Sequence, residues 1–142
     1  MFLGEYDYRI DQKGRVAIPA KLREAFRDGV VLSRGFDNCI AVYPVAEWQR
    51  VADRLATLPL TRSNARRVNR FTFSGAFSLE LDRLGRVVLP SALRQYAQIK
   101  EDVIIAGVGR FIEIWSKALW AAEQSVMSEQ AGEIAEATEL SP

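Results

Sequence analysis

The stretch Asp11-Gln-Lys-Gly-Arg-Val-Ala-Ile-Pro-Ala-Lys-Leu-Arg23 decides the fold, because a second copy of it lies farther along the chain. It aligns without gaps on Asp82-Arg-Leu-Gly-Arg-Val-Val-Leu-Pro-Ser-Ala-Leu-Arg94, with seven identical residues in thirteen positions. The similarity resumes downstream after a one-residue shift, which pairs Trp48 with Trp120. The 142 residues are therefore predicted to form two copies of a unit of about 70 residues.

Each copy is predicted to be a β-hairpin followed by a short helix and two further strands. Gly14 and Gly85 can supply the positive φ that a tight hairpin turn requires. Pro19 and Pro90 stand where a first helical residue is expected, a position at which a missing N–H costs nothing. The predicted strands are residues 6–10, 15–18, 30–32 and 40–43 of the first unit, and 77–81, 86–89, 103–105 and 111–115 of the second.

A longer helix is predicted to close each unit. The first runs from Pro44 to Pro59 with apolar residues on one face, and the second begins at a Ser116 cap. Residues 61–70 between the units are expected to be a short basic helix or a loop, and the last residues have few large apolar groups. The predicted organisation is a first module at 1–58, a basic connector at 59–72, a second module at 73–126 and an acidic, disordered tail at 127–142.

The residue counts remove several classes of active site. Cys39 is the only cysteine and the chain has no histidine, so an internal disulfide, a thiolate zinc site and a histidine-based triad are excluded. Cys39 lies in an apolar stretch and is expected to be a core residue. We expect no cofactor, no small-molecule substrate and no enzymatic activity, although the 18 Asp and Glu leave a carboxylate enzyme formally open.

Basic charge is concentrated in parts of the chain, although the net charge is only +1. Six basic residues lie between Arg9 and Arg27, and four arginines without any acid lie between Leu60 and Leu79. Everything after Lys117 carries five glutamates and no base. Arginine outnumbers lysine 15 to 4, a bias that suits bidentate contacts to phosphate or guanine.

The sequence gives no indication of membrane insertion or export. The start of the chain is acidic and lacks a basic segment followed by an apolar run. The longest apolar candidate, residues 103–109, is much shorter than the ~20 residues that a spanning helix needs. A cytoplasmic protein without a membrane partner is therefore expected.

The repeated hairpins favour DNA as the partner. If the two units pack about a pseudo-twofold axis, Arg15 and Arg86 project together, with Lys13 and Arg83 beside them, and a two-stranded ribbon fits a major groove. Asp11 and Asp82 are then better interpreted as groups that orient the turn, because a carboxylate that faced phosphate would repel it. The alternative is that each Asp–Arg pair only closes its hairpin as a surface salt bridge worth about 0–1 kcal/mol.

The chain resembles the MraZ family of bacterial regulators, which are built from two tandem AbrB-like swapped-hairpin modules. The resemblance covers roughly residues 1–125. It rests on Met1-Phe-Leu-Gly-Glu-Tyr6, on the two Asp-x-x-Gly-Arg hairpins, on Phe73-Ser-Gly-Ala76 and on Gly107-Val-Gly-Arg-Phe-Ile-Glu-Ile-Trp-Ser-Lys117. It implies an α+β, β-rich fold of two β-barrel modules with pseudo-twofold symmetry, short helices and a C-terminal helix.

The resemblance also implies a function. It implies a nucleoid-associated, sequence-specific regulator of transcription that binds short direct repeats upstream of the division and cell-wall gene cluster, its own promoter included. It implies a ring-shaped homo-oligomer. The DNA-binding residues that it implies here are Asp11, Lys13, Gly14, Arg15, Asp82, Arg83, Gly85 and Arg86.

Two positions depart from the family pattern, and other functions compete with this one. Leu84 is apolar where a polar residue is usual, and Tyr8 stands where histidine is frequent. The first departure predicts weaker or redirected DNA contacts by the second hairpin. A protein-interaction scaffold, in which the exposed strand edges serve only assembly, is the main alternative, and a carboxylate hydrolase is another.

Overall fold

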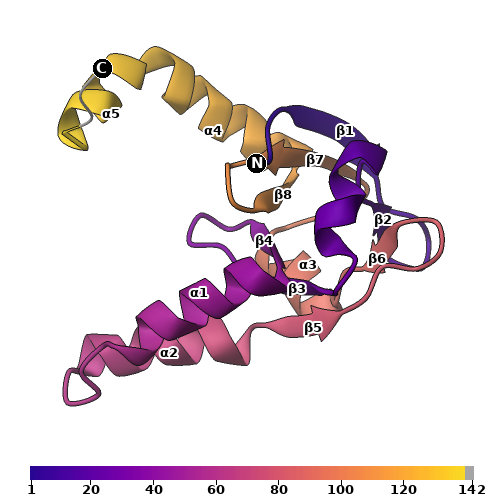
Figure 1. Ribbon diagram of the computed structural model, residues 1–142. Helices are drawn as coiled ribbons and strands as arrows, with labels where there is room; N and C mark the ends of the chain where they lie inside the picture. Colours follow the sequence, from indigo (N-terminus) through magenta and orange to yellow (C-terminus); the bar gives the residue numbers. More distant parts are fainter. Residues whose placement is uncertain (140–142) are drawn as a thin grey trace.

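The computed structural model of the chain describes residues 1–139 and is rich in strands (Figure 1). In chain order its elements are β1 (Glu5–Arg9), β2 (Arg15–Ala17), the 3-10 helix η1 (Ala20–Phe26), β3 (Val30–Arg34), β4 (Ile40–Pro44), α1 (Val45–Ala56), α2 (Ser63–Ser74), β5 (Phe77–Leu79), β6 (Arg86–Val88), α3 (Ser91–Tyr96), β7 (Asp102–Gly107), β8 (Ile112–Ser116), α4 (Lys117–Glu129) and α5 (Ala131–Ala137). The two units repeat the same order of two strands, a short helix, two further strands and a helix.

The main sheet is antiparallel and takes strands from both units. Its order is β1-β7-β8-β4-β3-β5, so the first strand of each unit lies against the third strand of the other. Tyr6 of β1 is opposite Ile105 of β7, and Ser78 of β5 is opposite Val31 of β3. The pairing of β4 with β8 joins the units at the centre of the sheet. The units therefore cannot be separated without breaking the sheet at several places.

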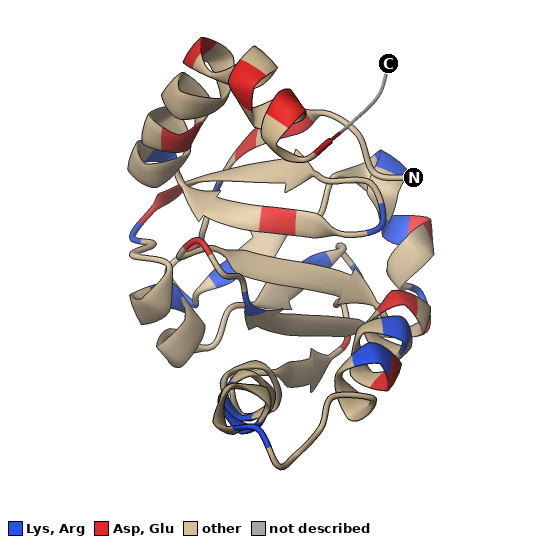
Figure 2. Ribbon diagram, turned by 90° about the vertical axis from the view of Figure 1, so that its left-hand side faces the viewer, with Lys and Arg blue, Asp and Glu red and all other residues tan. Residues whose placement is uncertain are grey.

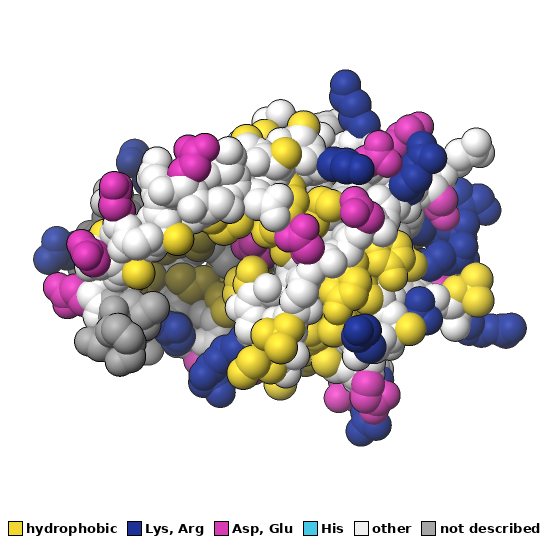
Figure 3. Space-filling view, turned by 90° about the horizontal axis from the view of Figure 1, so that it is seen from above, with side chains coloured by type: hydrophobic (Ala, Val, Ile, Leu, Met, Phe, Trp, Pro, Cys, Tyr) yellow, Lys and Arg dark blue, Asp and Glu magenta, His cyan; other side chains and the backbone are white. Residues whose placement is uncertain are grey.

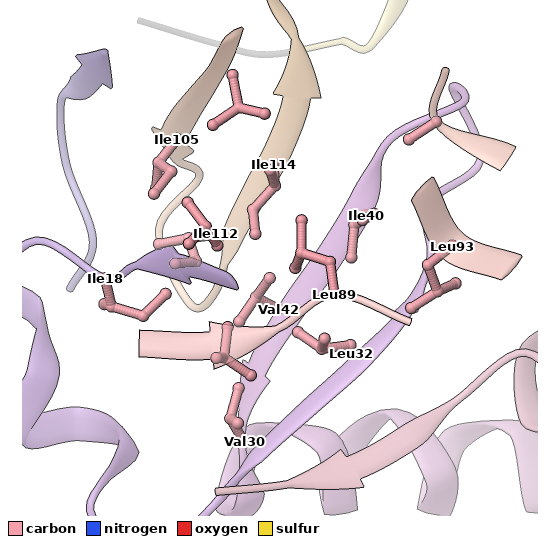
Figure 4. Packing of buried hydrophobic residues seen from close by; sticks show 14 of the residues in the cluster. Ile18, Val30, Leu32, Ile40, Val42, Leu89, Leu93, Ile105, Ile112 and Ile114 are labelled. Carbon is pink, nitrogen blue, oxygen red and sulfur yellow. The ribbon is translucent and has the colours of Figure 1, made fainter. Parts of the chain in front are cut away.

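The hydrophobic core lies between one face of this sheet and a smaller layer. That layer consists of the two-stranded ribbon β2–β6 with the short helices that follow it, η1 and α3. Alternation along each strand directs one set of side chains into the core, and Figure 4 shows these aliphatic groups meeting. The largest fully buried side chains include Ile18, Leu32, Leu89, Ile105 and Ile114.

The longer helices lie on the opposite face of the sheet. Helix α1 contacts β4 and β3, α2 contacts β3, and α4 contacts β7 and β8. Figure 2 shows the strands between α4–α5 at the top and α1–α2 at the bottom. Ser116 caps α4 as predicted, because its Oγ accepts a hydrogen bond from Leu119 N at 3.1 Å.

The structure agrees with the predicted fold class in its broad terms and differs in one feature. A mixed α+β, strand-rich chain with two repeated modules and C-terminal helices is confirmed. The predicted β-barrels are not found in residues 1–139, because the six-stranded sheet ends in two edge strands, β1 and β5, that do not pair with each other. None of the helices in this range has the length and apolar character needed to cross a membrane.

The C-terminal segment has more helix than its composition led us to expect. Residues 127–142 were predicted to be a disordered acidic tail, whereas α4 extends to Glu129 and α5 covers Ala131–Ala137. Alanine and glutamate are among the strongest helix formers, so this segment forms helices although it has few large apolar groups. Residues 140–142 of that segment lie outside the described residues.

Candidate nucleic-acid interface

The first Asp-x-x-Gly-Arg segment is a turn that its own aspartate holds together. One oxygen of Asp11, Oδ1, accepts the backbone N–H groups of Lys13 and Arg15, each at 2.9 Å. The other oxygen, Oδ2, accepts Arg15 Nε at 2.7 Å. Gly14 closes the turn by donating its N–H to Asp11 O at 3.0 Å, with φ at +75°. Asp11 therefore orients Arg15, as the sequence predicted.

The second segment repeats this geometry. Asp82 Oδ1 accepts the N–H groups of Leu84 at 3.0 Å and Arg86 at 2.8 Å, and Oδ2 accepts Arg86 Nε at 2.8 Å. Gly85 donates to Asp82 O at 2.9 Å with φ at +76°. Two turns that differ so little in geometry show that the duplication preserved the turn itself, although the residues at its tip changed.

The hydrogen bonds lower the pKa of both aspartates. For Asp11 the backbone N–H of Arg15 has the largest effect, and for Asp82 that of Arg86, with the arginine guanidinium adding to each. Partial desolvation acts in the opposite direction and is outweighed. Both carboxylates are thus held ionised, and each keeps its arginine fixed.

The strands that follow the two turns, β2 and β6, pair with each other as one ribbon. In the antiparallel pairing of β2 with β6, Arg15 is opposite Val88 and Ala17 is opposite Arg86. Val16 and Val87 are each 1% exposed and face the core, so the alternate residues, the two arginines among them, share the outer face. Arg86 Nη1 also lies 4.0 Å from Asp11 Oδ2 in the other unit. The structure thus brings Arg15 and Arg86 together.

The turn of each hairpin is bonded to the strand end of the other. Ile18 donates its N–H to Gly85 O at 2.9 Å, and Leu89 donates its N–H to Gly14 O at 2.8 Å. These two contacts are equivalent under the exchange of the units. Each glycine turn is therefore held by the other copy as well as by its own aspartate.

Two further arginines stabilise this crossing, and our prediction from the sequence missed them. Arg23 Nε donates to Ile18 O at 2.8 Å, and its side chain lies against Gly85 so closely that a Cβ there would be 2.2 Å from Arg23 Nε. Arg94 Nε donates to Leu89 O at 3.0 Å, and a Cβ on Gly14 would lie 3.3 Å from Arg94 Cζ. Arg23 and Arg94 occupy equivalent positions of the repeat and are identical. This identity is the sequence signal that could have identified them.

The remaining predicted residues lie at the exposed tips. Lys13 and Arg83 are exposed, and within residues 1–139 neither forms an ion pair. The side chains of Arg15 and Arg86 keep 27% and 30% of their surface exposed. In Figure 3 many Lys and Arg side chains gather at the right-hand end of the molecule, the end at which Figure 1 shows the ribbon and its turns. The ribbon thus presents several cations on one protruding edge.

Two further observations concern the single cysteine and the residue types that bind metal ions. Cys39 is buried at 0% exposure, as predicted, and burial raises the pKa of its thiol. Residues 1–139 contain no group of three or more His, Cys, Asp or Glu residues arranged to hold a metal ion.

Comparison with known proteins places the chain in a family. A family model of the MraZ protein matches residues 1–71 and again residues 72–140, one match for each unit. The chain belongs to the MraZ family. A relative from Syntrophomonas wolfei, named transcriptional regulator MraZ, is 51% identical over 136 residues, covering 96% of this chain and 95% of the relative. MraZ regulators of Herpetosiphon aurantiacus and Natranaerobius thermophilus are 46% and 50% identical over 96% and 84% of this chain, and over 95% and 84% of their own lengths.

The family assignment confirms the resemblance that the hairpins and the flanking segments indicated. The boundary between the two matches, after residue 71, lies within α2 and close to the predicted start of the second module at residue 73. The family matches cover whole units and assign no role to single residues. The roles of the hairpin side chains therefore rest on their hydrogen bonds and their exposure.

Proposed function

We propose that this chain is a DNA-binding regulator of transcription whose β2–β6 ribbon enters the major groove. The observation that carries the proposal is the pair of superposable turns that hold Arg15 and Arg86 on one outer face. The MraZ relatives, which are named as regulators of transcription, support the biological role. Action on the chromosome would make the chain a cytoplasmic, nucleoid-associated protein.

The hairpin residues divide into two roles in this proposal. Arg15 and Arg86 each use Nε on an aspartate, which leaves the terminal amino groups for the O6 and N7 acceptors of guanine. Lys13 and Arg83 at the exposed tips bind phosphates. The aspartates and glycines, Asp11, Gly14, Asp82 and Gly85, shape the turns without touching DNA bases.

The exchange of strands between the units supports an AbrB-like swapped-hairpin arrangement. In such a fold the first hairpin of each unit completes the sheet of the other. The pairings β1–β7 and β3–β5 and the joint β2–β6 ribbon have this character. One chain would then contain a complete DNA-reading head.

A ring of several copies is the assembly that we propose, and opposite charges at two places on the chain support it. Helix α2 carries Arg66, Arg67 and Arg70 without an acid, whereas α4 and α5 carry glutamates beyond Lys117 (Figure 2). A head-to-tail contact between unlike surfaces generates a ring when its rotation closes. Ring subunits that repeat one orientation suit the short direct repeats that we propose as the target, upstream of the division and cell-wall gene cluster and its own gene.

The proposal is tested by replacing Arg15 and Arg86 together with alanine. In a mobility-shift assay with DNA from the gene's own upstream region, we expect specific binding to be lost while the circular dichroism spectrum is retained. Each phosphate contact contributes about 0.9 to the slope of log K against log salt, so the affinity of the wild-type chain should fall as the salt concentration rises.

A matched control is the double variant Arg27→Ala with Arg110→Ala. It removes the same charge from two exposed arginines, one at the end of η1 and one in the turn before β8. We expect it to bind almost as tightly as the wild-type chain. If the two double variants bound the upstream DNA with equal affinity, the ribbon would not be the DNA-binding site. An oligomer without preference for its upstream DNA over random DNA would favour the scaffold function.

A further inference from the structure

The outer face of the ribbon has an apolar part that the proposed function does not use. Leu84, at the tip of the second turn, is 64% exposed, whereas the equivalent position of the first turn is Lys13. Val88 in β6 is 51% exposed and lies opposite Arg15. Each apolar residue is thus near one of the two arginines. Leu84 precedes Arg86 by two residues in the chain, and Val88 lies opposite Arg15 across the ribbon.

Both side chains are fixed by the backbone. The N–H of Leu84 is bonded to Asp82 Oδ1 at 3.0 Å, so the turn determines where the residue sits. Val88 follows Val87, which is 1% exposed and faces the core, and strand alternation therefore directs Val88 outward. Neither residue can withdraw into the core without breaking the turn or the register.

A protein surface that enters the major groove meets mostly polar groups. The phosphates and the donor and acceptor edges of the bases are polar, and the thymine 5-methyl group is the apolar feature that distinguishes one base there. An exposed leucine or valine beside a guanine-binding arginine would lose its water shell against this methyl group. If the same side chains faced a phosphate or a cytosine amino group, they would displace water from that polar group and offer it no hydrogen bond, which costs free energy.

We propose that Leu84 and Val88 read thymine through its 5-methyl group. The inference rests on the proposed function and deepens it, because it names part of the sequence that the ribbon prefers. The first turn has Lys13 where the second has Leu84, and β2 has the small Ala17 where β6 has Val88. The two halves of the reading head therefore differ, and methyl recognition belongs to the second hairpin.

The test uses the full-length chain and DNA that it selects from a random pool. In the selected duplex each thymine is replaced by uracil, one position at a time, which removes the methyl group and leaves base pairing intact. We expect the affinity of the wild-type chain to fall about four-fold at one or two positions, the effect of burying one methyl-sized group.

Two variants test whether Leu84 and Val88 cause the preference for thymine over uracil. Leu84→Gln should bind thymine and uracil equally at one of these positions, and Val88→Ser, which removes both methyl groups of the valine, should do so at another. Lys13→Gln is the matched control at the equivalent tip of the first turn, and it should keep the full preference for thymine. Both tip residues are exposed, so folding is not at risk.

The outcomes separate this inference from the proposed function. Selection of a defined sequence together with indifference to every uracil substitution would overturn methyl recognition and leave DNA reading by the arginines intact. A thymine preference that survived at every position in both Leu84→Gln and Val88→Ser would also overturn it. Failure to select any DNA, by contrast, would remove the proposed function itself.

Discussion

Asp11 and Asp82 are each bonded to three donors of their own turn, so their carboxylates form part of the hairpin. The sequence alone allowed this role to be predicted, because the Asp-x-x-Gly-Arg spacing brings the aspartate back to its own arginine. Arg23 and Arg94 could not be assigned in the same way, since their approaches to Gly85 and Gly14 cross from one unit to the other. A contact between units depends on the packing of the units, which no local spacing contains.

The lowered pKa values of Asp11 and Asp82 predict how stability depends on pH. Because both values lie below the ordinary 3.8, the unfolded chain binds more protons than the folded chain in this range. The stabilisation is therefore complete above pH 3.8 and is lost as the pH falls through the lowered values. Carbon NMR of the carboxyl groups, recorded during an acid titration, should place both transitions below those of exposed aspartates.

The variant Asp82→Asn serves as the control for this titration. It should remove one of the two carboxyl titrations that occur at low pH. It should also reduce the amount by which acidification lowers the free energy of unfolding measured in urea. Between about pH 6 and pH 8, far above the lowered pKa values of Asp11 and Asp82, DNA affinity should be constant. Transitions of Asp11 and Asp82 at or above 3.8 would contradict the hydrogen-bonded turn that the structure describes.

At the level of elements, the sequence predicted where the strands lie but did not predict their order in the sheet. The tight turns, the buried strands and the capped helix after Ser116 follow from local patterns, and the observed elements lie close to the predicted ranges. The prediction of a paired hairpin within each unit was wrong, because β1 pairs with β7 and β5 with β3, while β2 and β6 pair with each other. The order β1-β7-β8-β4-β3-β5 does not follow, because the duplication gives β1 two similar partners, β3 and β7. Only the connections and the packing of the whole core decide between partners of nearly the same sequence.

The crossing of the hairpins predicts an asymmetry between two glycine substitutions. Gly14→Ala and Gly85→Ala both place a side chain at positive φ, which costs roughly 1–2 kcal/mol. Gly85→Ala should cost more, because its Cβ would lie 2.2 Å from Arg23 Nε and would displace the bond of that arginine to Ile18 O. Urea unfolding of the two variants measures the difference in free energy.

The double variant Gly85→Ala with Arg23→Ala identifies the cause. If the clash with Arg23 is responsible, the two substitutions together should destabilise the chain by less than the sum of their separate effects. A Cβ at Gly14 would lie no closer than 3.3 Å to Arg94, at its Cζ atom. We therefore expect the destabilisations caused by Gly14→Ala and Arg94→Ala to be closer to additive. Equal losses for the two glycines, both additive with the arginine changes, would speak against the crossed packing.

At the scale of the whole molecule, charge is separated between the two ends of the helical face. Arg62, Arg67 and Arg70 are exposed and form no ion pair within residues 1–139. At the other end, α5 and the second half of α4 are exposed along their length, and Val126, Met127 and Ile134 keep 44%, 37% and 40% of their surface in contact with water. A helix of seven residues with no buried side chain is only marginally stable in water, so α5 is expected to gain stability from a partner.

These features predict that a second copy places α5 against α2. Reversing two charges with Arg67→Glu and Arg70→Glu turns attraction into repulsion and should raise the dissociation constant of the oligomer at least about ten-fold at low salt. Analytical ultracentrifugation across protein concentration and salt measures this shift. The control is Arg50→Glu with Arg54→Glu on α1, which makes the same change in charge on a neighbouring helix.

Compensating substitutions test the pairing itself. Adding Glu133→Arg and Glu136→Arg to the α2 double variant restores opposite charges with the signs exchanged, and the oligomer should recover. A general effect of net charge would instead weaken assembly equally in the α1 control and would give no recovery. Because the contact joins unlike surfaces, mixing the α2 variant with the α5 variant should produce hetero-oligomers, whereas each alone should dissociate. Assembly of the α2 variant at the wild-type concentration would show that another surface holds the copies together.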